Sequence, residues 1–263
     1  AWVYGDGALA AFADAYLITL GSGFLLWLAT RRATRDVSHR DGFLLVTLFW
    51  VVLALFGALP LYLSGTAPGF TAAFFEAVSG LTTTGATVLS GIDELPHAVR
   101  FWRQEMQWLG GMGIIILAVA ILPILQIGGM QLYKAEIPGP VKDQKLTPRI
   151  NQTAKALWVI YTGLTVAAAV ALWMAGLTPF DAISHSFTAV ATAGFSTHDA
   201  SIGHFGNPAV EYIITVFMFL GGINFALHFA FLHGDGLRAY VTDPEFRTYA
   251  GLIAGLVVVV TLV

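Results

Sequence analysis

The chain has 263 residues, of which 57% are hydrophobic and only 11% charged, and its mean hydropathy is +0.74. A soluble globular protein of this length needs more polar surface, so the composition indicates an integral membrane protein. The net charge of −3 argues against a nucleic-acid partner. The absence of cysteine excludes disulfides, thiolate metal sites and cysteine nucleophiles.

Apolar stretches close to the ~20 residues needed to cross a hydrocarbon core recur along the chain. They cover roughly 8–29, 42–63, 104–127, 153–175 and 209–233, and a sixth begins near 246. The first lacks the basic start and small-residue cleavage site of a signal peptide, so we expect a retained helix. Because Ala1 is not an initiator Met and an apolar run reaches Val263, we expect a piece of a longer protein.

Basic residues collect after the first, third and fifth apolar stretches, where eleven of the thirteen Lys and Arg side chains lie. Cytoplasmic loops carry such an excess of positive charge. The pattern therefore predicts a multi-pass protein whose basic loops are cytoplasmic. The segments 64–103 and 176–208 then face the outside.

Two shorter apolar segments lie in these outer regions, at Phe70–Leu81 and at 179–191. Their ~12–13 residues make only ~18–20 Å of helix, which is too short for a ~30 Å hydrocarbon core. The second also has helix-start signals, with Thr178 as N-cap, Pro179 at the first position and Asp181 in the first turn. We expect both to be half-helices that enter from outside and point their C-termini inward.

A polar, glycine-centred break follows each half-helix, at 82–87 and 192–197. When Gly85 is aligned with Gly194, Glu76 falls on His185, so the chain repeats a unit of helix, half-helix, glycine turn and helix. Both copies have the same orientation, which predicts a pseudo-symmetry axis along the membrane normal. The expected fold is an all-α membrane protein of repeated helix–pore-helix–filter loop–helix units around a pore.

A dehydrated cation needs replacement oxygens, and backbone carbonyls at a constriction supply them without a trapping charge. Glycine allows the positive φ that turns carbonyls toward an axis, and a half-helix C-terminus adds partial negative charge. The turns therefore predict cation ligands. The carbonyls are those of Thr83, Thr84, Gly85, Ala86, Thr192, Ala193, Gly194 and Phe195, and the ion is held at Thr84, Gly85, Ala193 and Gly194. The hydroxyls nearby either brace the turn or add ligands, and hydroxyl-to-backbone bracing is the commoner role.

Other polar residues leave two interpretations open. Glu76 is either a cation attractor in the outer vestibule or a hydrogen-bonded brace, and Thr87, Ser196 and Asp199 are further candidates for vestibule or filter support. Asn224, which shares a helix face with the residue four positions later, either lines the inner pore or joins helices. The seven histidines have no metal-ligand spacing such as H-E-x-x-H, so their spacing predicts no zinc site.

Four motifs carry a resemblance to a known family. They are SGLTTTGAT at 79–87, WLGGMGI at 108–114, AEIPGP at 135–140 and GFSTHD at 194–199. Together they resemble the TrkH family of potassium-uptake subunits in the Trk/Ktr/HKT superfamily. The resemblance implies four units around one pore, with one filter glycine per unit, so that Gly85 and Gly194 serve the first two units. It also implies K+ as the transported ion, no covalently bound cofactor, and a place in the cell inner membrane.

The resemblance further implies a homodimer that binds a cytoplasmic, nucleotide-binding regulatory ring of the TrkA type. The basic connector 131–149 is either the docking surface or a loop that only fixes topology. The resemblance also implies an order of segments along the chain. It comprises an extra transmembrane helix at 1–30, a first pore unit at 40–130, a cytoplasmic connector at 131–152, a second pore unit at 153–233, and a cytoplasmic loop with the start of a truncated third unit at 234–263.

The leading functional hypothesis is potassium-selective permeation gated by that cytoplasmic partner. The alternative is an ion-coupled secondary transporter, for K+/H+ or K+/Na+ symport or for a small solute. A solute transporter favours inverted repeats and a midplane pocket, whereas these repeats run parallel. An intramembrane enzyme needs an activated nucleophile, and Ser79, Ser184 and Ser186 have no evident base. We therefore expect that the chain is not an enzyme.

Overall fold

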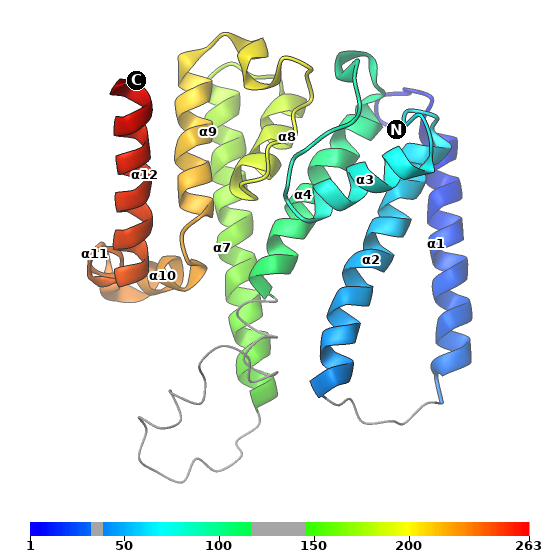
Figure 1. Cartoon of the computed structure of the whole chain (residues 1–263), viewed down its shortest axis with the longest axis horizontal. Coiled ribbons are helices and arrows are strands. Elements are labelled where there is room, and N and C mark those ends of the chain that lie inside the picture. The colour runs from blue at the N-terminus through cyan, green and yellow to red at the C-terminus, as the bar shows by residue number, and fades with distance from the viewer. Residues whose placement is uncertain (33–38, 117–145, 263) are drawn as a thin grey trace.

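The computed structural model describes residues 1–32, 39–116 and 146–262, and the regular structure within these ranges is helical. The longer helices run side by side (Figure 1). They are α1 (Leu9–Thr30), α2 (His39–Leu63), α4 (His97–Ile116), α7 (Leu146–Met174), α9 (Pro208–Gly221) and α12 (Pro244–Leu262). Two shorter helices, α3 (Phe70–Leu81) and α8 (Pro179–Val190), lie among their upper ends. Short elements complete the chain: η1 (Ile92–Glu94), η3 (Ser201–Phe205), α10 (Phe225–Ala230), η4 (Phe231–Asp235) and α11 (Arg238–Thr242).

Four helices in the described ranges are long and apolar enough to cross a membrane, and a bent pair makes a fifth candidate span. The four are α1, Val46–Leu63 of α2, Lys155–Met174 of α7, and α12. The third predicted crossing, 104–127, starts within α4, and its part after Ile116 lies outside the described residues.

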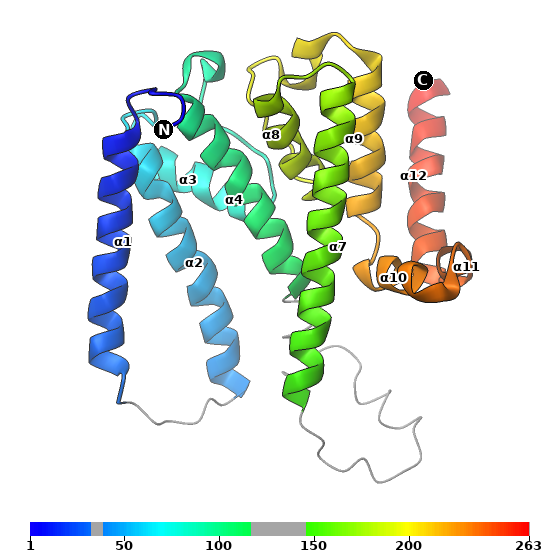
Figure 2. The ribbon, with the colours of Figure 1, turned by 180° about the vertical axis from the view of Figure 1, so that it is seen from behind.

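The predicted fifth crossing, 209–233, is wrong as a single straight helix. Pro208–Gly221 and Phe225–Gly234 meet at an angle of 95°. The side chain of Asn224 accepts a hydrogen bond from the Ala226 N–H at 3.0 Å and so begins a new helix at this point. As a result α10 and α11 lie across the lower end of α12, as Figure 2 shows from behind.

The two predicted short helices are present with nearly the predicted bounds. Helix α3 has the expected bounds, and α8 ends one residue before the expected end. The Thr178 hydroxyl accepts a hydrogen bond from the Asp181 N–H at 3.1 Å, and Pro179 occupies the first position of α8. These local signals fix the start of α8 because they satisfy N–H groups that a helix leaves unpaired.

Each half-helix is held in its own apolar core. Helices α2, α3 and α4 form the first unit, with Ala58, Ala77 and Met106 among its buried residues. Helices α7, α8 and α9 form the second unit in the same order, with Leu172 and Ala189 buried. A third cluster joins the units and is listed here: Met112, Leu157, Ile160, Tyr161, Ala168, Val190 and Phe225.

Close packing against the end of each half-helix is the same in both units. A Cβ on Gly110 of α4 would lie 2.0 Å from the Leu81 carbonyl oxygen, and one on Gly221 of α9 would lie 2.4 Å from that of Val190. Both distances exclude a side chain, so glycine is what lets each helix approach the C-terminus of the half-helix.

A tyrosine of the next helix lies against the following glycine in each unit, Gly111 and Gly222. The Tyr161 hydroxyl of α7 donates to the Trp108 carbonyl at 2.9 Å, and the Tyr249 hydroxyl of α12 donates to the Phe219 carbonyl at 3.2 Å. Helix α12 thus makes the same tyrosine contact with the second unit that α7 makes with the first.

Candidate functional site

The two glycine turns have positive φ angles at matched positions. Thr83 and Thr192 have φ of 55° and 52°, and Gly85 and Gly194 have φ of 75° and 118°. A positive φ is uncommon for residues other than glycine, and for a β-branched threonine it is a clear outlier. Such strain persists only where the surroundings impose it, and it gathers at functional sites. Its recurrence at matched positions indicates that this backbone form is required.

Equivalent hydrogen bonds hold both turns to their half-helices. The Thr83 N–H donates to the Gly80 carbonyl at 3.0 Å, as the Thr192 N–H does to Ala189 at 3.1 Å. One residue later the N–H groups of Thr84 and Ala193 donate to the carbonyls of Ser79 and Thr188, at 2.9 and 3.0 Å. These N–H groups therefore bond to carbonyls of the half-helix and not to carbonyls of the turn.

The two turns lie against each other although they are far apart in sequence. A Cβ on Gly85 would lie 2.2 Å from the carbonyl oxygen of Ala193 and 3.2 Å from the Cα of Gly194. Among the described residues, nothing lies within 4 Å of the corresponding Cβ position on Gly194. The first turn is thus packed on the second, and the second has an open side.

A buried ion pair stands behind the first turn. The carboxylate of Glu76 is fully buried and accepts from the Nε of Arg103 at 2.7 Å, with the Arg103 side chain also fully buried. Glu76 also accepts from the Thr87 hydroxyl at 2.8 Å and from the Val88 N–H at 3.2 Å. Its carboxylate therefore faces protein groups that shape the chain just after the turn.

Arg103 connects the first turn to the second. Its guanidinium donates to the Ser196 carbonyl at 3.0 Å and to the Thr87 hydroxyl at 3.2 Å, and it lies 4.3 Å from the centre of the Phe195 ring. One helical turn further along α4, the Gln107 side chain accepts from the Phe195 N–H at 3.3 Å. One face of α4 from the first unit thus supports the loop of the second.

His185 occupies the place behind the second turn that Glu76 occupies behind the first. Its ring is fully buried, with Nδ1 2.9 Å from the Asp181 carbonyl and Nε2 3.1 Å from the Ser196 hydroxyl. Ser196 and Thr87 are matched positions in the repeat, so the same brace is made with different side chains. The Ser196 hydroxyl also accepts from the His198 N–H at 3.1 Å.

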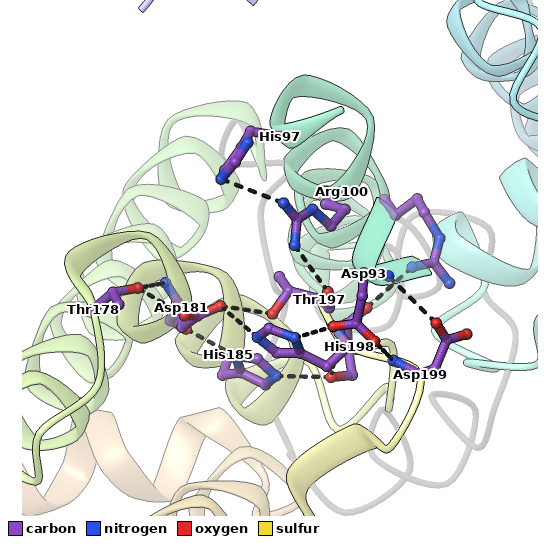
Figure 3. A network of polar contacts seen from close by, with 11 residues as sticks. Asp93, His97, Arg100, Thr178, Asp181, His185, Thr197, His198 and Asp199 are labelled. Carbon is purple, nitrogen blue, oxygen red and sulfur yellow. Dashed lines mark hydrogen bonds and ion pairs between the residues drawn. The ribbon is translucent and has the colours of Figure 1, made fainter. Parts of the chain in front are cut away.

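A polar network extends outward from the second turn (Figure 3). The Thr197 hydroxyl donates to Asp181 at 2.7 Å, and the ring of His198 lies between Asp181 and Asp93. Asp93 and Asp199 each accept a hydrogen bond from the other's backbone N–H, at 3.2 and 3.3 Å. The hydrogen bond to His198 and that from the Asp199 N–H hold the pKa of the Asp93 carboxyl below its ordinary value.

The remaining predicted site residues are placed as follows. The Thr82 hydroxyl donates to the Val78 carbonyl at 2.8 Å and lies 2.8 Å from the Thr84 hydroxyl, so both lie in the bracing geometry. Asn224 is exposed and donates to Glu245 of α12 at 3.1 Å, which joins two helices. The predicted docking connector 131–149 falls mainly on residues outside the described ranges.

Two features were missed by sequence reasoning. Nothing in the sequence spacing of Arg103 indicates that its side chain reaches both turns. A group of possible metal ligands, Asp93, His198 and His204, comes together only in the fold. The alignment of the two repeats gave one indication of this group, because it predicts that the loops holding these residues lie around a common axis.

The fold and the paired turns define the class: an all-helical, multi-pass membrane protein with two half-helices whose turns meet. The chain matches the TrkH family, described as cation transport protein, over residues 8–263. It is 56% identical over its whole length to the Trk system potassium uptake protein TrkH of Salmonella typhimurium and to that of Escherichia coli, covering 55% of each.

A solved structure, the potassium transporter TrkH from Vibrio parahaemolyticus, is also similar. It is 49% identical, with a TM-score of 0.86, and the match covers 98% of this chain and 52% of that one. The chain therefore belongs to the TrkH family of cation transport proteins, and it spans about half the length of the relatives it matches. The expectation that it is not an enzyme agrees with this family.

Proposed function

We propose that the two glycine turns are the first two selectivity loops of a potassium pathway, in which backbone carbonyls replace the water around K+. The proposed ligands are the carbonyls of Thr83, Thr84, Gly85, Ala86, Thr192, Ala193, Gly194 and Phe195, with the ion held chiefly at Thr84, Gly85, Ala193 and Gly194. One observation carries the proposal: two turns distant in sequence share a strained backbone form and meet at Gly85 and Ala193.

The charges around the turns support a cation. Helices α3 and α8 both end at a turn, and a helix C-terminus carries the equivalent of about half a negative charge. The nearby positive charge of Arg103 is paired with Glu76, so it is compensated behind the turn rather than directed at the carbonyls. Glu76, Thr87 and Ser196 then act as filter support.

The arrangement around the pore is part of the same proposal. Four carbonyl loops surround a potassium-type filter, and two adjacent units provide two of them. Tyr249 of α12 makes the contact with the second unit that Tyr161 of α7 makes with the first, which supports a role for α12 as the first helix of a third unit. The open side of Gly194 is where the loop of that unit would fit. The pseudo-symmetry axis then follows the membrane normal.

Partners and location follow from the family resemblance. We propose a homodimer in the cell inner membrane, with the turns facing outside and the basic connector 131–149 facing the cytoplasm. The proposed regulator is a cytoplasmic nucleotide-binding ring of the TrkA type. The relatives named above are potassium uptake proteins of the Trk system, which supports K+ as the transported ion.

Ion flux through the full-length protein in liposomes tests the proposal, with K+, Rb+, Na+ and Li+ compared. Gly85→Ser should lower the K+/Na+ flux ratio about tenfold, equivalent to about 1.4 kcal/mol, because its Cβ displaces the Ala193 carbonyl. Gly65→Ser is the matched control, since Gly65 also has positive φ (72°) but has open space around it. An unchanged ratio in Gly85→Ser would count against the filter. Potassium flux that requires an H+ or Na+ gradient would favour the coupled symporter.

A further inference from the structure

Three metal-ligating side chains converge on the outer side of the second turn. Asp93 lies in η1 of the first unit, His198 follows the second turn, and His204 lies in η3. Each offers one ligand atom, and these atoms all lie within 4.8 Å of one another. The rings of His198 and His204 are stacked, with centroids 3.5 Å apart and planes at 5°. Two loops from different units thus bring three possible metal ligands close together.

We propose that Asp93, His198 and His204 form a binding site for a divalent transition-metal ion, with Zn2+ as the best-matched ion. Two imidazole nitrogens and one carboxylate oxygen are the donor set that zinc accepts, with a fourth position left for water. Calcium and magnesium prefer all-oxygen ligands. The donor chemistry therefore separates this site from the proposed K+ ligands, which are backbone carbonyls.

A zinc ion requires the three ligand atoms to change their spacing, because Nδ1 of His198 and Oδ1 of Asp93 are in direct contact without it. Zinc bonds of about 2.0–2.2 Å place the ligand atoms of one ion within about 4.4 Å of one another. Since an imidazole lone pair lies in the plane of its ring, His204 has to turn out of its stack with His198, and Asp93 has to move back from Nδ1 of His198. The side chains of Asp93 and His204 are exposed and free to make these rotations, whereas His198 is held more firmly. Their exposure also gives an ion a direct route from the outer solution.

His198 has the outer-sphere partner typical of a zinc-bound histidine. Its Nδ1 contacts Asp93, and its Nε2 lies 3.3 Å from Asp181. A ligating imidazole usually points its other N–H at a carboxylate, which fixes the tautomer and the ring orientation. Asp181 is itself held by the hydroxyls of Thr178 and Thr197, both at 2.7 Å. This assigns Nδ1 of His198 as the metal ligand and Asp181 as a positioning residue.

The second half of the donor set is oriented as well. The backbone N–H of Asp199 donates to Asp93 Oδ2 at 3.2 Å, which leaves Oδ1 toward His198. The buried Nε2 of His198 lies near Asp181 but makes no hydrogen bond to any of the described residues. A metal ion on Nδ1 would place the ring proton on Nε2, where it could be donated to Asp181. A bound ion would tie the loop before α4 to the loop after the second turn.

Calorimetric titration of the full-length protein with ZnCl2 tests the site, after treatment with a chelator and with MgCl2 as the comparison ion. His204→Gln removes one exposed ligand and should weaken zinc affinity at least tenfold. The control is His233→Gln, which removes an exposed histidine outside the cluster and should leave affinity unchanged. Equal zinc affinity in the two variants would overturn the proposal. This readout does not depend on the proposed filter.

A second variant tests the geometry without removing a ligand. Asp181→Asn keeps all three donors and weakens the outer-sphere contact, which typically costs 10–100-fold in metal affinity. We expect a loss of about tenfold. Unchanged zinc affinity in Asp181→Asn would overturn the assignment of Nδ1 of His198 as the ligand.

Discussion

The two turns have similar backbone features but are supported by different side chains. Behind the first, Glu76 and Arg103 form a fully buried ion pair, whereas behind the second, His185 bridges the Asp181 carbonyl and the Ser196 hydroxyl. Both turns nevertheless have positive φ at matched residues, and the two N–H groups before each glycine make equivalent hydrogen bonds. The positive φ of the turn residues is therefore shared by the two units, whereas the side chains that support each turn differ.

The two units also differ in how much each depends on the other. Arg103 of the first unit donates to the Ser196 carbonyl and lies over the Phe195 ring, so the second turn is supported from outside its own unit. His185 therefore contacts residues of its own unit only, whereas Arg103 contacts residues of both units.

Loss of Arg103 should have the largest effect, because this side chain contacts both turns. Arg103→Met leaves Glu76 buried without its cationic partner, and removing one member of a buried pair typically costs about 3–5 kcal/mol. Unfolding of the full-length protein in mixed micelles measures the loss. The double variant Glu76→Gln/Arg103→Met should recover part of it. A double variant no more stable than the single one would contradict the pairing.

Close packing should give the next largest effect, and it should be alike in the two units. Gly110→Ala and Gly221→Ala both force a Cβ into a carbonyl oxygen, and overpacking of this kind costs about 1–3 kcal/mol. Gly163→Ala is the control, because Gly163 lies in α7 with nothing within 4 Å of its Cβ position. That change should be neutral or stabilising, since alanine favours helix by up to about 1 kcal/mol.

If Gly110→Ala lowers the free energy of unfolding no more than Gly163→Ala does, the close packing of α4 on the end of α3 would be contradicted. A large difference between Gly110→Ala and Gly221→Ala would show that the units are packed differently.

Loss of His185 should have the smallest effect, because its bonds are neutral and local. His185→Gln retains one polar group for Ser196, so we expect a cost near the net value of one hydrogen bond, about 0.5–1.5 kcal/mol. The K+/Na+ flux ratio should fall less than in Arg103→Met. A larger effect of His185→Gln than of Arg103→Met would reverse the proposed order of the braces.

The parts of the fold that were predicted are those whose signals are local. The start of α8 is encoded by Thr178, Pro179 and Asp181, which act within one turn of helix. The repeat followed from matched polar breaks in an apolar background. The bend after Gly221 was missed, because the Asn224 cap lies inside a continuous apolar stretch that periodicity alone assigns to one helix.

The parts that were missed depend on contacts between distant segments. Glu76 and Arg103 are apart in sequence and meet only when α3 packs on α4, so no spacing rule links them. The Asp93, His198 and His204 group joins loops of two units, and histidine spacing along the chain carries no trace of it. Sequence could identify the turns, but the network that supports them required the fold.

The most direct test of the central claim is the position of a heavy K+ substitute in a crystal of the full-length protein. Anomalous diffraction from Rb+ or Tl+ should give a peak within coordination distance of the carbonyls of Thr84, Gly85, Ala193 and Gly194. A peak at that position is the predicted result. Ions bound only elsewhere, with these carbonyls directed away from them, would contradict the account.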